Sequence, residues 1–164
     1  MINGASCNGT DHSGCGHPAA TISAGLAPFG LSVDDHTHTV YAAINTSGHS
    51  PGSVAVINTA SCNGTHTAGC HGPFPHMPTG ATPILTALDT STGILYVTDG
   101  ISAEVTALRT AHCNATDTTG CQVPGRELPI SSAPNAIAVD QNSNTVYVTN
   151  TYQAGAVTVF TGQH

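Results

Sequence analysis

Six cysteines fall into three pairs, and their thiols have two chemical options: bonding to one another or binding a metal. In every pair seven residues separate the cysteines, and the enclosed loops NGTDHSG, NGTHTAG and NATDTTG are polar. Six cysteines allow 15 pairings in principle. The repeated spacing predicts that each loop closes on itself, which would stabilise the fold by about 2–3 kcal/mol for a ring of this size. The predicted disulfide pairs are Cys7 and Cys15, Cys62 and Cys70, and Cys113 and Cys121.

A zinc site is the rival interpretation of the second loop. Two thiolates and two imidazoles would satisfy tetrahedral Zn²⁺, and the set would be Cys62, His66, Cys70 and His71. The other two loops carry Asp11 and Asp117 in place of His66. Because a zinc site should not lose a ligand while it keeps both cysteines, we expect disulfides, no metal and no cofactor. The weak metal candidates are His66, His71 and His76.

Asparagine side chains in the same loops fit glycosylation sequons. The candidate sites are Asn8, Asn45, Asn63 and Asn114. The alternative is that Asn-Gly and Asn-Ala followed by Thr simply form turns. The sequence contains no G-x-S-x-G elbow, H-E-x-x-H motif or phosphate-binding loop, and so no catalytic set is predicted.

The loops belong to a longer repeat. Tyr41, Tyr96 and Tyr147 are 55 and then 51 residues apart, and in each copy an Asp lies seven residues before the Tyr. A period of this length indicates a repeat architecture. We expect each Asp to bond backbone N–H groups in a turn rather than bind calcium, and each Tyr to pack between repeats. These aspartates are Asp34, Asp89 and Asp140.

Composition favours an all-β fold. The 164 residues include 18 Gly and 10 Pro but no Lys, two Arg and two Glu, which is poor in helix formers and rich in turn formers. Each repeat contains four short segments rich in Val, Ile, Thr and Tyr. In the unit 29–80 a fourth strand is expected before Gly80, but Pro73, Pro75 and Pro78 weaken it, and it is expected at best at an edge. The predicted strands are Ala20–Ser23, Phe29–Val33, Thr39–Ile44, Ser53–Asn58, Ile84–Leu88, Ile94–Thr98, Glu104–Leu108, Glu127–Ser131, Ala136–Val139, Thr145–Thr149 and Ala156–Thr161.

Many of these strands are apolar on both sides, as expected for sheets that are stacked between neighbours. Four-stranded sheets stacked in this way form a β-propeller. A β-sandwich would explain the strand count but not the period. We therefore predict one domain, 1–164, made of propeller blades: the end of a preceding blade (1–28), two full blades (29–80 and 81–132), and three strands of a last blade (133–164).

The segments VYVTN (146–150), LYVTD (95–99) and VYAAIN (40–45) resemble the YVTN family of β-propeller repeats. The resemblance covers nearly the whole chain and implies a propeller scaffold of the kind found in secreted and surface-layer proteins. It does not imply one chemistry, since related propellers include a lyase that acts on a cyclic antibiotic. The cysteine loop in each repeat departs from the shortest family repeats.

Three blades, one of them split between the ends, are too few to close a ring. Two chains would complete each other's split blade in a six-bladed dimer, chains would join head to tail in an open fibre, or the chain is a segment of a longer propeller. The partner expected first is therefore the protein itself, followed by a cell-surface polymer or a protein.

Charge and hydropathy restrict the other partners. The formal net charge is −7 with two fixed cations, which excludes a phosphate-binding patch and therefore nucleic acid. No apolar run is long enough to span a bilayer. No signal peptide is expected in this chain, and the disulfides indicate secretion or the cell surface.

These features favour a structural or binding module over an enzyme. In propellers, the loops between second and third strands and between blades form the ligand face. Here they offer His49, Asp99 and Tyr152. The alternative function is a lyase-like enzyme with a metal-assisted histidine base, for which an acid–base pair is not assured.

Overall fold

The computed structural model describes residues 1–46, 48–151 and 155–162. The prediction of an all-β protein is confirmed. Within the described residues the elements are β1 (Pro28–Asp34), β2 (Thr39–Ile44), β3 (Pro51–Asn58), the 3-10 helix η1 (Ala68–His71), β4 (His76–Ala81), β5 (Pro83–Asp89), β6 (Ile94–Asp99), β7 (Glu104–Arg109), β8 (Arg126–Pro129), β9 (Pro134–Asp140), β10 (Thr145–Asn150) and β11 (Ala156–Thr161).

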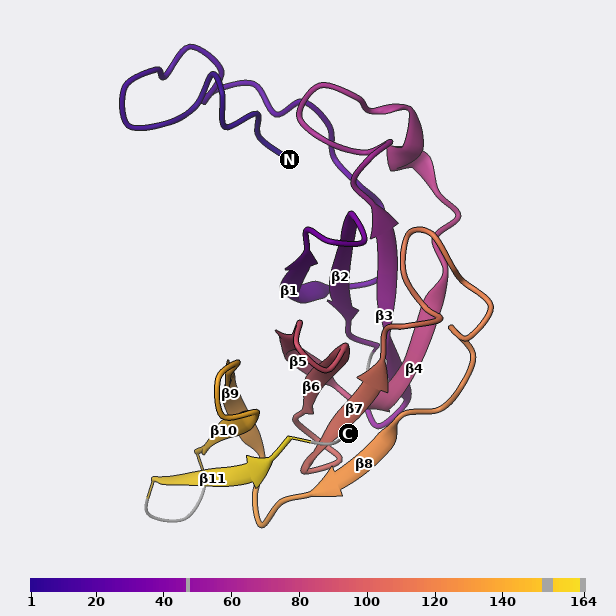
Figure 1. The fold of residues 1–164 in the computed structure, drawn as a ribbon, viewed down its shortest axis with the longest axis vertical. Helices are drawn as coiled ribbons and strands as arrows, with labels where there is room; N and C mark the ends of the chain where they lie inside the picture. The colour runs from indigo at the N-terminus through magenta and orange to yellow at the C-terminus, as the bar shows by residue number, and fades with distance from the viewer. Residues whose placement is uncertain (47, 152–154, 163–164) are drawn as a thin grey trace.

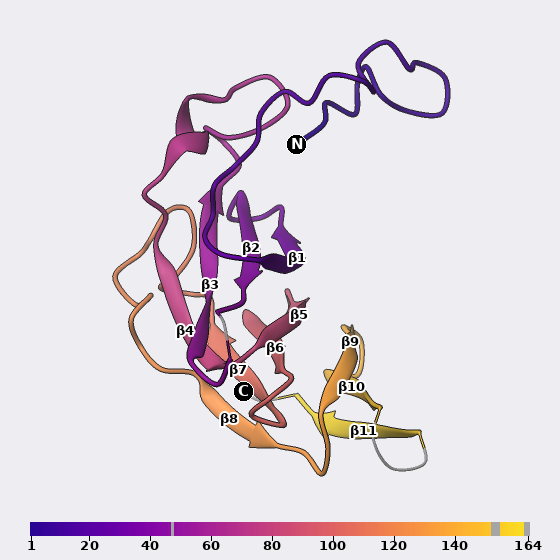
Figure 2. The same ribbon diagram turned by 180° about the vertical axis from the view of Figure 1, so that it is seen from behind.

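The strands form three antiparallel sheets. The first sheet has the order β1-β2-β3-β4, the second β5-β6-β7-β8, and the third β11-β10-β9. Figures 1 and 2 show the sheets following one another in a curved row that does not close. The N-terminal arm, residues 1–27, lies at one end of this row, and the third sheet lies at the other.

Alternating side chains explain why the sheets stack. In β6, Leu95 and Val97 belong to the core between the first and second sheets. Their neighbour Tyr96 belongs to the core between the second and third sheets, together with Ile94. Because successive residues of a strand point to opposite faces, the second sheet buries apolar residues on both sides, as its sequence predicts.

The first strands of the sheets, β1, β5 and β9, contact one another in turn. β1 approaches β5 closely at Gly30, where an added Cβ would lie 2.6 Å from the Cα of Leu85. Any larger residue would push the two sheets apart at this point. Glycine at position 30 therefore permits the backbone contact.

The repeated aspartates form the expected turns. Asp34 accepts hydrogen bonds from the backbone N–H groups of His36 and Thr37 (2.9 and 3.3 Å). Asp89 accepts the equivalent bonds from Ser91 and Thr92 (3.0 and 3.3 Å). Each carboxylate thus satisfies the backbone of a tight turn between two strands.

One predicted strand is wrong. Residues 20–23 are extended chain without strand assignment, although Met1 N–H donates to Ala20 O (2.9 Å) and Ala19 N–H donates to Met1 O (3.0 Å). In the first sheet, Val56 N–H makes the equivalent bond to Pro75 O (2.9 Å). In the first sheet the ladder continues to Met77 and Pro78, which pair with Val54 and Ser53, whereas residues 21–23 have no paired strand among the described residues.

Tyr41 links the first sheet to the second. Its side chain is 0% exposed, and its hydroxyl donates to the carbonyl oxygen of Cys113 (3.0 Å). Burial, aided by the nearby Asp34 carboxylate, raises the pKa of Tyr41 to about 12. The phenol is therefore neutral and acts as a hydrogen-bond donor.

Replacing Tyr41 by Phe is expected to lower the free energy of unfolding by about 1–2 kcal/mol, because the buried Cys113 carbonyl loses its donor. Urea unfolding followed by circular dichroism measures the change. Tyr147→Phe is the matched control and should have no effect on a single chain, since Tyr147 is exposed. Equal losses in both variants would contradict this role for Tyr41.

Candidate interaction surfaces

Each cysteine loop closes on itself, as the repeat predicts. The bridges are Cys7–Cys15, Cys62–Cys70 and Cys113–Cys121, with Cα–Cα distances of 4.8, 4.9 and 4.6 Å. Three disulfides are consistent with an oxidising compartment. No helix in the described part of the chain has the length and hydropathy needed to cross a bilayer.

The third loop packs on the neighbouring sheet. Ala115 N–H donates to Thr39 Oγ1 (2.8 Å), and Asn58 Nδ2 donates to Ala115 O (3.4 Å). Cys113 and Cys121 belong to the core between the first two sheets. The loop therefore contributes to the interface between sheets as well as closing its own ring.

Removing the Cys113–Cys121 bridge by Cys→Ala at both positions is expected to lower the free energy of unfolding by about 3 kcal/mol. Most of this loss is chain entropy, and the remainder is lost core packing. The matched control removes Cys7 and Cys15, which enclose a ring of the same size away from the core. The control loses only the chain-entropy part, so its free energy of unfolding should fall by less, and an equal loss in both variants would contradict the packing described for the third loop.

The sequon asparagines of the three cysteine loops, Asn8, Asn63 and Asn114, are used in turns. Each Oδ1 accepts backbone N–H bonds, and each Nδ2 donates to the carbonyl four residues earlier, at 2.8–2.9 Å. Asn114 is 4% exposed, so a glycan there would have to displace the packed loop, whereas Asn8 is exposed. Asn45 is half-buried, and its sequon ends at Ser47, outside the described residues.

The three weak metal candidates do not converge. His66 Nδ1 is 3.0 Å from the Thr65 hydroxyl, His76 Nδ1 is 2.9 Å from Ser53 Oγ, and His71 is exposed. Cys62 and Cys70 are bonded to each other. Among the described residues, no group of three or more His, Cys, Asp or Glu side chains is arranged to hold a metal ion.

The ligand-face candidates lie in different environments. His49 is exposed in the loop after β2, whereas Asp99 is fully buried at the end of β6. Thr82 lies between these loops: its hydroxyl donates to Gly48 O (3.4 Å), and its carbonyl accepts from Gly100 N–H (2.9 Å). The third candidate, Tyr152, lies outside the described residues.

Asp99 is an unusual buried acid. It accepts a hydrogen bond from the Thr106 hydroxyl at 2.6 Å through Oδ2, while Oδ1 has no hydrogen-bond partner. Burial raises the pKa of Asp99 to about 7, and the charge of nearby Glu104 acts in the same direction. Burial also raises the pKa of Glu104. The buried Asp99 carboxyl group is therefore more stable in its neutral form than as a carboxylate.

The outer face of the third sheet is apolar and exposed. Tyr147 is 41% exposed, and Val157 and Val159 are each 56% exposed. Val159 lies opposite Tyr147 in the ladder between β10 and β11, so the three side chains share one face. The expectation that all three repeated tyrosines would be enclosed therefore fails at Tyr147, because no neighbouring sheet covers it in the described structure. We call these three residues the tyrosine face.

An apolar groove lies on the opposite end of the row. It has a volume of about 600 Å³ and runs between the N-terminal arm and the outer face of the first sheet. Phe29, Leu31 and Val33 on β1 are all more than half exposed beside it. We call it the outer groove, and its lining includes Met1, Ile22, Phe29, Val40, Ile57 and Cys62.

Sequence reasoning identified the disulfide loops but neither of these two surfaces. The repeat itself would have located them, because Tyr147 is equivalent to Tyr41 and Ile57 to Leu108. The repeat does not show which copies of these residues lack a neighbouring sheet. That information depends on the arrangement of the sheets.

No protein-family model and no curated protein matches the chain by sequence. Comparison by structure finds similar folds among solved structures. One is in the crystal structure of a nidogen/laminin complex, with a TM-score of 0.54 and 16% identity over 82% of this chain. The other is hydrazine synthase of Kuenenia stuttgartiensis, with a TM-score of 0.56 and 20% identity over 86% of this chain.

This chain spans 44% of the first matched chain and 34% of the second. Both neighbours are propeller-like, and the likeness at these identities concerns the fold alone. The arrangement of the sheets in this chain is therefore propeller-like.

Proposed function

We propose that this protein is an extracellular structural or binding module of the YVTN propeller-repeat type, whose copies associate head to tail. Its sheets serve as propeller blades, and the tyrosine face of one copy packs into the outer groove of the next. The observation that carries the proposal is that the same contact already exists inside the chain, between the first and second sheets.

The internal contact supplies the template for the tyrosine face. Tyr41 lies opposite Val56 in the ladder between β2 and β3, as Tyr147 lies opposite Val159. Val54 precedes Val56 by two positions, as Val157 precedes Val159. Tyr41, Val54 and Val56 are almost completely buried against the second sheet. The tyrosine face therefore presents the same residue types in the same positions.

The receiving surface also has its counterpart. On the second sheet, the side chains that cover Tyr41 include the paired residues Leu95 and Leu108. On the first sheet, Val40 and Ile57 are paired in the same way and line the outer groove. Cys62 follows Ile57 at the distance that separates Cys113 from Leu108. In the assembly the Tyr147 hydroxyl would thus donate to the carbonyl of Cys62, as Tyr41 does to that of Cys113.

The strand edges complement each other as well. The first and second sheets have four strands, whereas the third ends at β11. Residues 21–26 occupy the repeat position of β4, and in the described structure residues 21–23 have no paired strand. Addition of this segment to β11 of another copy would complete a fourth strand by β-augmentation. It would also cover an edge that otherwise favours aggregation.

Two geometries satisfy this contact. Two chains would close a six-bladed ring, whereas a rotation between successive copies that does not close would produce a fibre. In either assembly the exposed loops would be free to bind a surface polymer or another protein. The similarity to a chain from a nidogen/laminin complex and the three disulfides support an extracellular setting for this role.

Light scattering coupled to size-exclusion chromatography tests the proposal. Over a range of protein concentrations we expect the mass of two chains, or a mass that increases with concentration. A mass of one chain, 16.4 kDa, at every concentration would reject head-to-tail association.

A further inference from the structure

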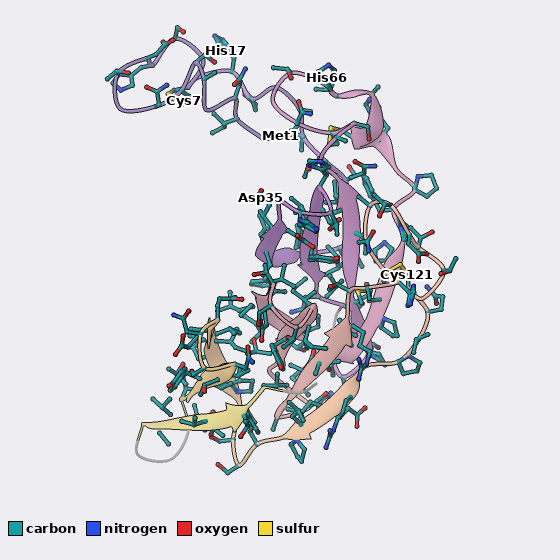
Figure 3. The ribbon with its side chains drawn as sticks, in the orientation of Figure 1. Met1, Cys7, His17, Asp35, His66 and Cys121 are labelled. Atoms are coloured by element: carbon teal, nitrogen blue, oxygen red, sulfur yellow. A yellow bond between two sulfur atoms is a disulfide. The ribbon has the colours of Figure 1, made fainter. Side chains whose placement is uncertain are left out.

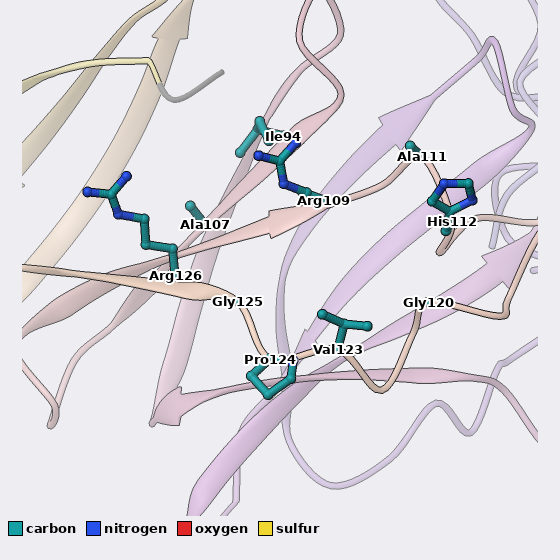
Figure 4. Close-up of a pocket in the computed structure, with 10 residues that line it drawn as sticks. All are labelled: Ile94, Ala107, Arg109, Ala111, His112, Gly120, Val123, Pro124, Gly125 and Arg126. Atoms are coloured by element: carbon teal, nitrogen blue, oxygen red, sulfur yellow. The ribbon is translucent and has the colours of Figure 1, made fainter.

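Both arginines of the protein line a single pocket at the far side of the second sheet. The pocket has a volume of about 490 Å³, and Figure 4 shows Arg109 and Arg126 with His112 and Val123 around it. It lies between β7 and the segment that leads from the third cysteine loop into β8. We call it the arginine pocket. In a chain with net charge −7, this placement concentrates all the fixed positive charge at one site.

The equivalent place on the first sheet is already occupied. There the Cys113–Cys121 loop lies against Thr39 and Asn58, which are paired across β2 and β3. Ala115 of that loop donates to Thr39 and accepts from Asn58, and Gln122 Nε2 donates to His76 O (2.9 Å).

The second sheet repeats this receiving position. Ile94 and Arg109 are paired across β6 and β7 in the same register as Thr39 and Asn58, and both line the arginine pocket. Arg109 thus places a side-chain N–H donor where Asn58 holds the carbonyl of a docked loop. The pocket therefore lies at the position of the repeat that receives a cysteine loop on the first sheet. It also contains an N–H donor for a carbonyl group of that loop.

We propose that the arginine pocket receives the Cys7–Cys15 loop from the N-terminal arm of a second copy. This inference rests on the head-to-tail association proposed above, and it specifies a contact that the association does not require. Arg109 would donate to the carbonyl of Gly9, the position equivalent to Ala115. The arm that completes the third sheet at β11 would deliver the loop to this place.

The Cys7–Cys15 loop fits better than the other two loops. The Cys113–Cys121 loop is packed on its own first sheet, and Cys62 and Cys70 of the second loop are buried in the cluster on the outer side of the first sheet. Figure 3 shows the segment with Cys7 and His17 extending away from the three sheets. It has the same internal turn as the docked loop, since Asn8 and Asn114 each accept three N–H or O–H bonds in equivalent positions.

Charge favours the same choice. Asp11 occupies the place that His66 has in the second loop. Ser13 N–H donates to the Asp11 carboxylate (2.9 Å), and this bond lowers the pKa of Asp11. The loop therefore brings a negative charge to a pocket with two guanidinium groups, which favours association and its correct register.

Photocrosslinking tests the occupant. A benzoylphenylalanine in place of Val123, which is exposed at the pocket rim, is irradiated in a mixture with isotopically labelled full-length protein. We expect crosslinked peptides that join position 123 to residues 6–16 of the labelled copy. The control places the same group at Thr118, which is exposed but outside the pocket. Crosslinks confined to the same chain, or to another segment of the second copy, would overturn the proposal.

Two substitutions of Arg109 test its role as the hydrogen-bond donor. Arg109→Ala should weaken association about tenfold, the effect of losing one hydrogen bond to a charged group. Arg109→Asn restores the side chain found at position 58 and should weaken association less than threefold. Equal weakening by both variants would contradict the carbonyl contact. If association persists unchanged in both and no labelled loop is captured, the pocket proposal fails while head-to-tail association stands.

Discussion

Tyr147→Asp is expected to leave the protein as single chains at concentrations where the unsubstituted protein associates. In the proposed contact the ring enters an apolar groove, and a carboxylate there would lose its hydration without gaining a partner. Such burial costs several kcal/mol, so association should weaken at least about 100-fold. Light scattering at matched concentrations measures the effect.

Folding should be unaffected by Tyr147→Asp, because Tyr147 is 41% exposed in the single chain. Circular dichroism and urea unfolding at a concentration where both proteins are single chains check this point. Thr118→Asp adds the same charge at another exposed site and should leave association intact. If Tyr147→Asp associates as strongly as the unsubstituted protein, the tyrosine face is not the contact.

Asp99→Asn is expected to raise the free energy of unfolding at pH 8 and to change it little at pH 4. The pKa of Asp99 is raised from its ordinary value of 3.8 to about 7 in the fold. Below pH 3.8 the carboxyl is protonated in both the folded and unfolded states, and its contribution to stability is fully present. Between pH 3.8 and about 7 the unfolded state has released the proton while the folded state still holds it, so that contribution decreases steadily and is lost above about pH 7.

The size of this effect follows from the shift of the pKa. Each pKa unit corresponds to 1.36 kcal/mol, so the loss between about pH 4 and pH 8 is on the order of 4 kcal/mol. Asparagine is neutral throughout this range and still offers an oxygen to the Thr106 hydroxyl. Urea unfolding at pH 4, 6 and 8 compares the two proteins, with Asp35→Asn as the control at an exposed position. Parallel pH profiles for Asp99→Asn and the unsubstituted protein would contradict the assignment.

The strands were largely predictable because their pattern is local and repeated. Val, Ile, Thr and Tyr alternate between turns formed by Asp34 and its equivalents, and each copy supports the interpretation of the others. The segment Ala20–Ser23 was predicted incorrectly because a strand also needs a hydrogen-bonded partner. The sequence of the arm resembles that of a strand, but residues 21–23 have no paired strand among the described residues.

The exposure of side chains and the surroundings of the charged residues were less predictable, because they depend on contacts between repeats. Tyr147 has a local sequence similar to that of Tyr41, yet only Tyr41 is covered by a neighbouring sheet. The raised pKa of Asp99 was not apparent because the equivalent positions in the other repeats, Ile44 and Asn150, do not carry an acid. Arg109 and Arg126 are 17 positions apart, and they line the same pocket only because the intervening loop returns the chain to the sheet.

The environment of Tyr147 in an experimental structure of the assembled protein is the most direct test of head-to-tail stacking. We predict that the ring lies in the outer groove of another copy, against Val40 and Ile57, with its hydroxyl bonded to the carbonyl oxygen of Cys62. A structure in which Tyr147 packs against Tyr147 of another copy, or remains in solvent within the assembly, would contradict the account.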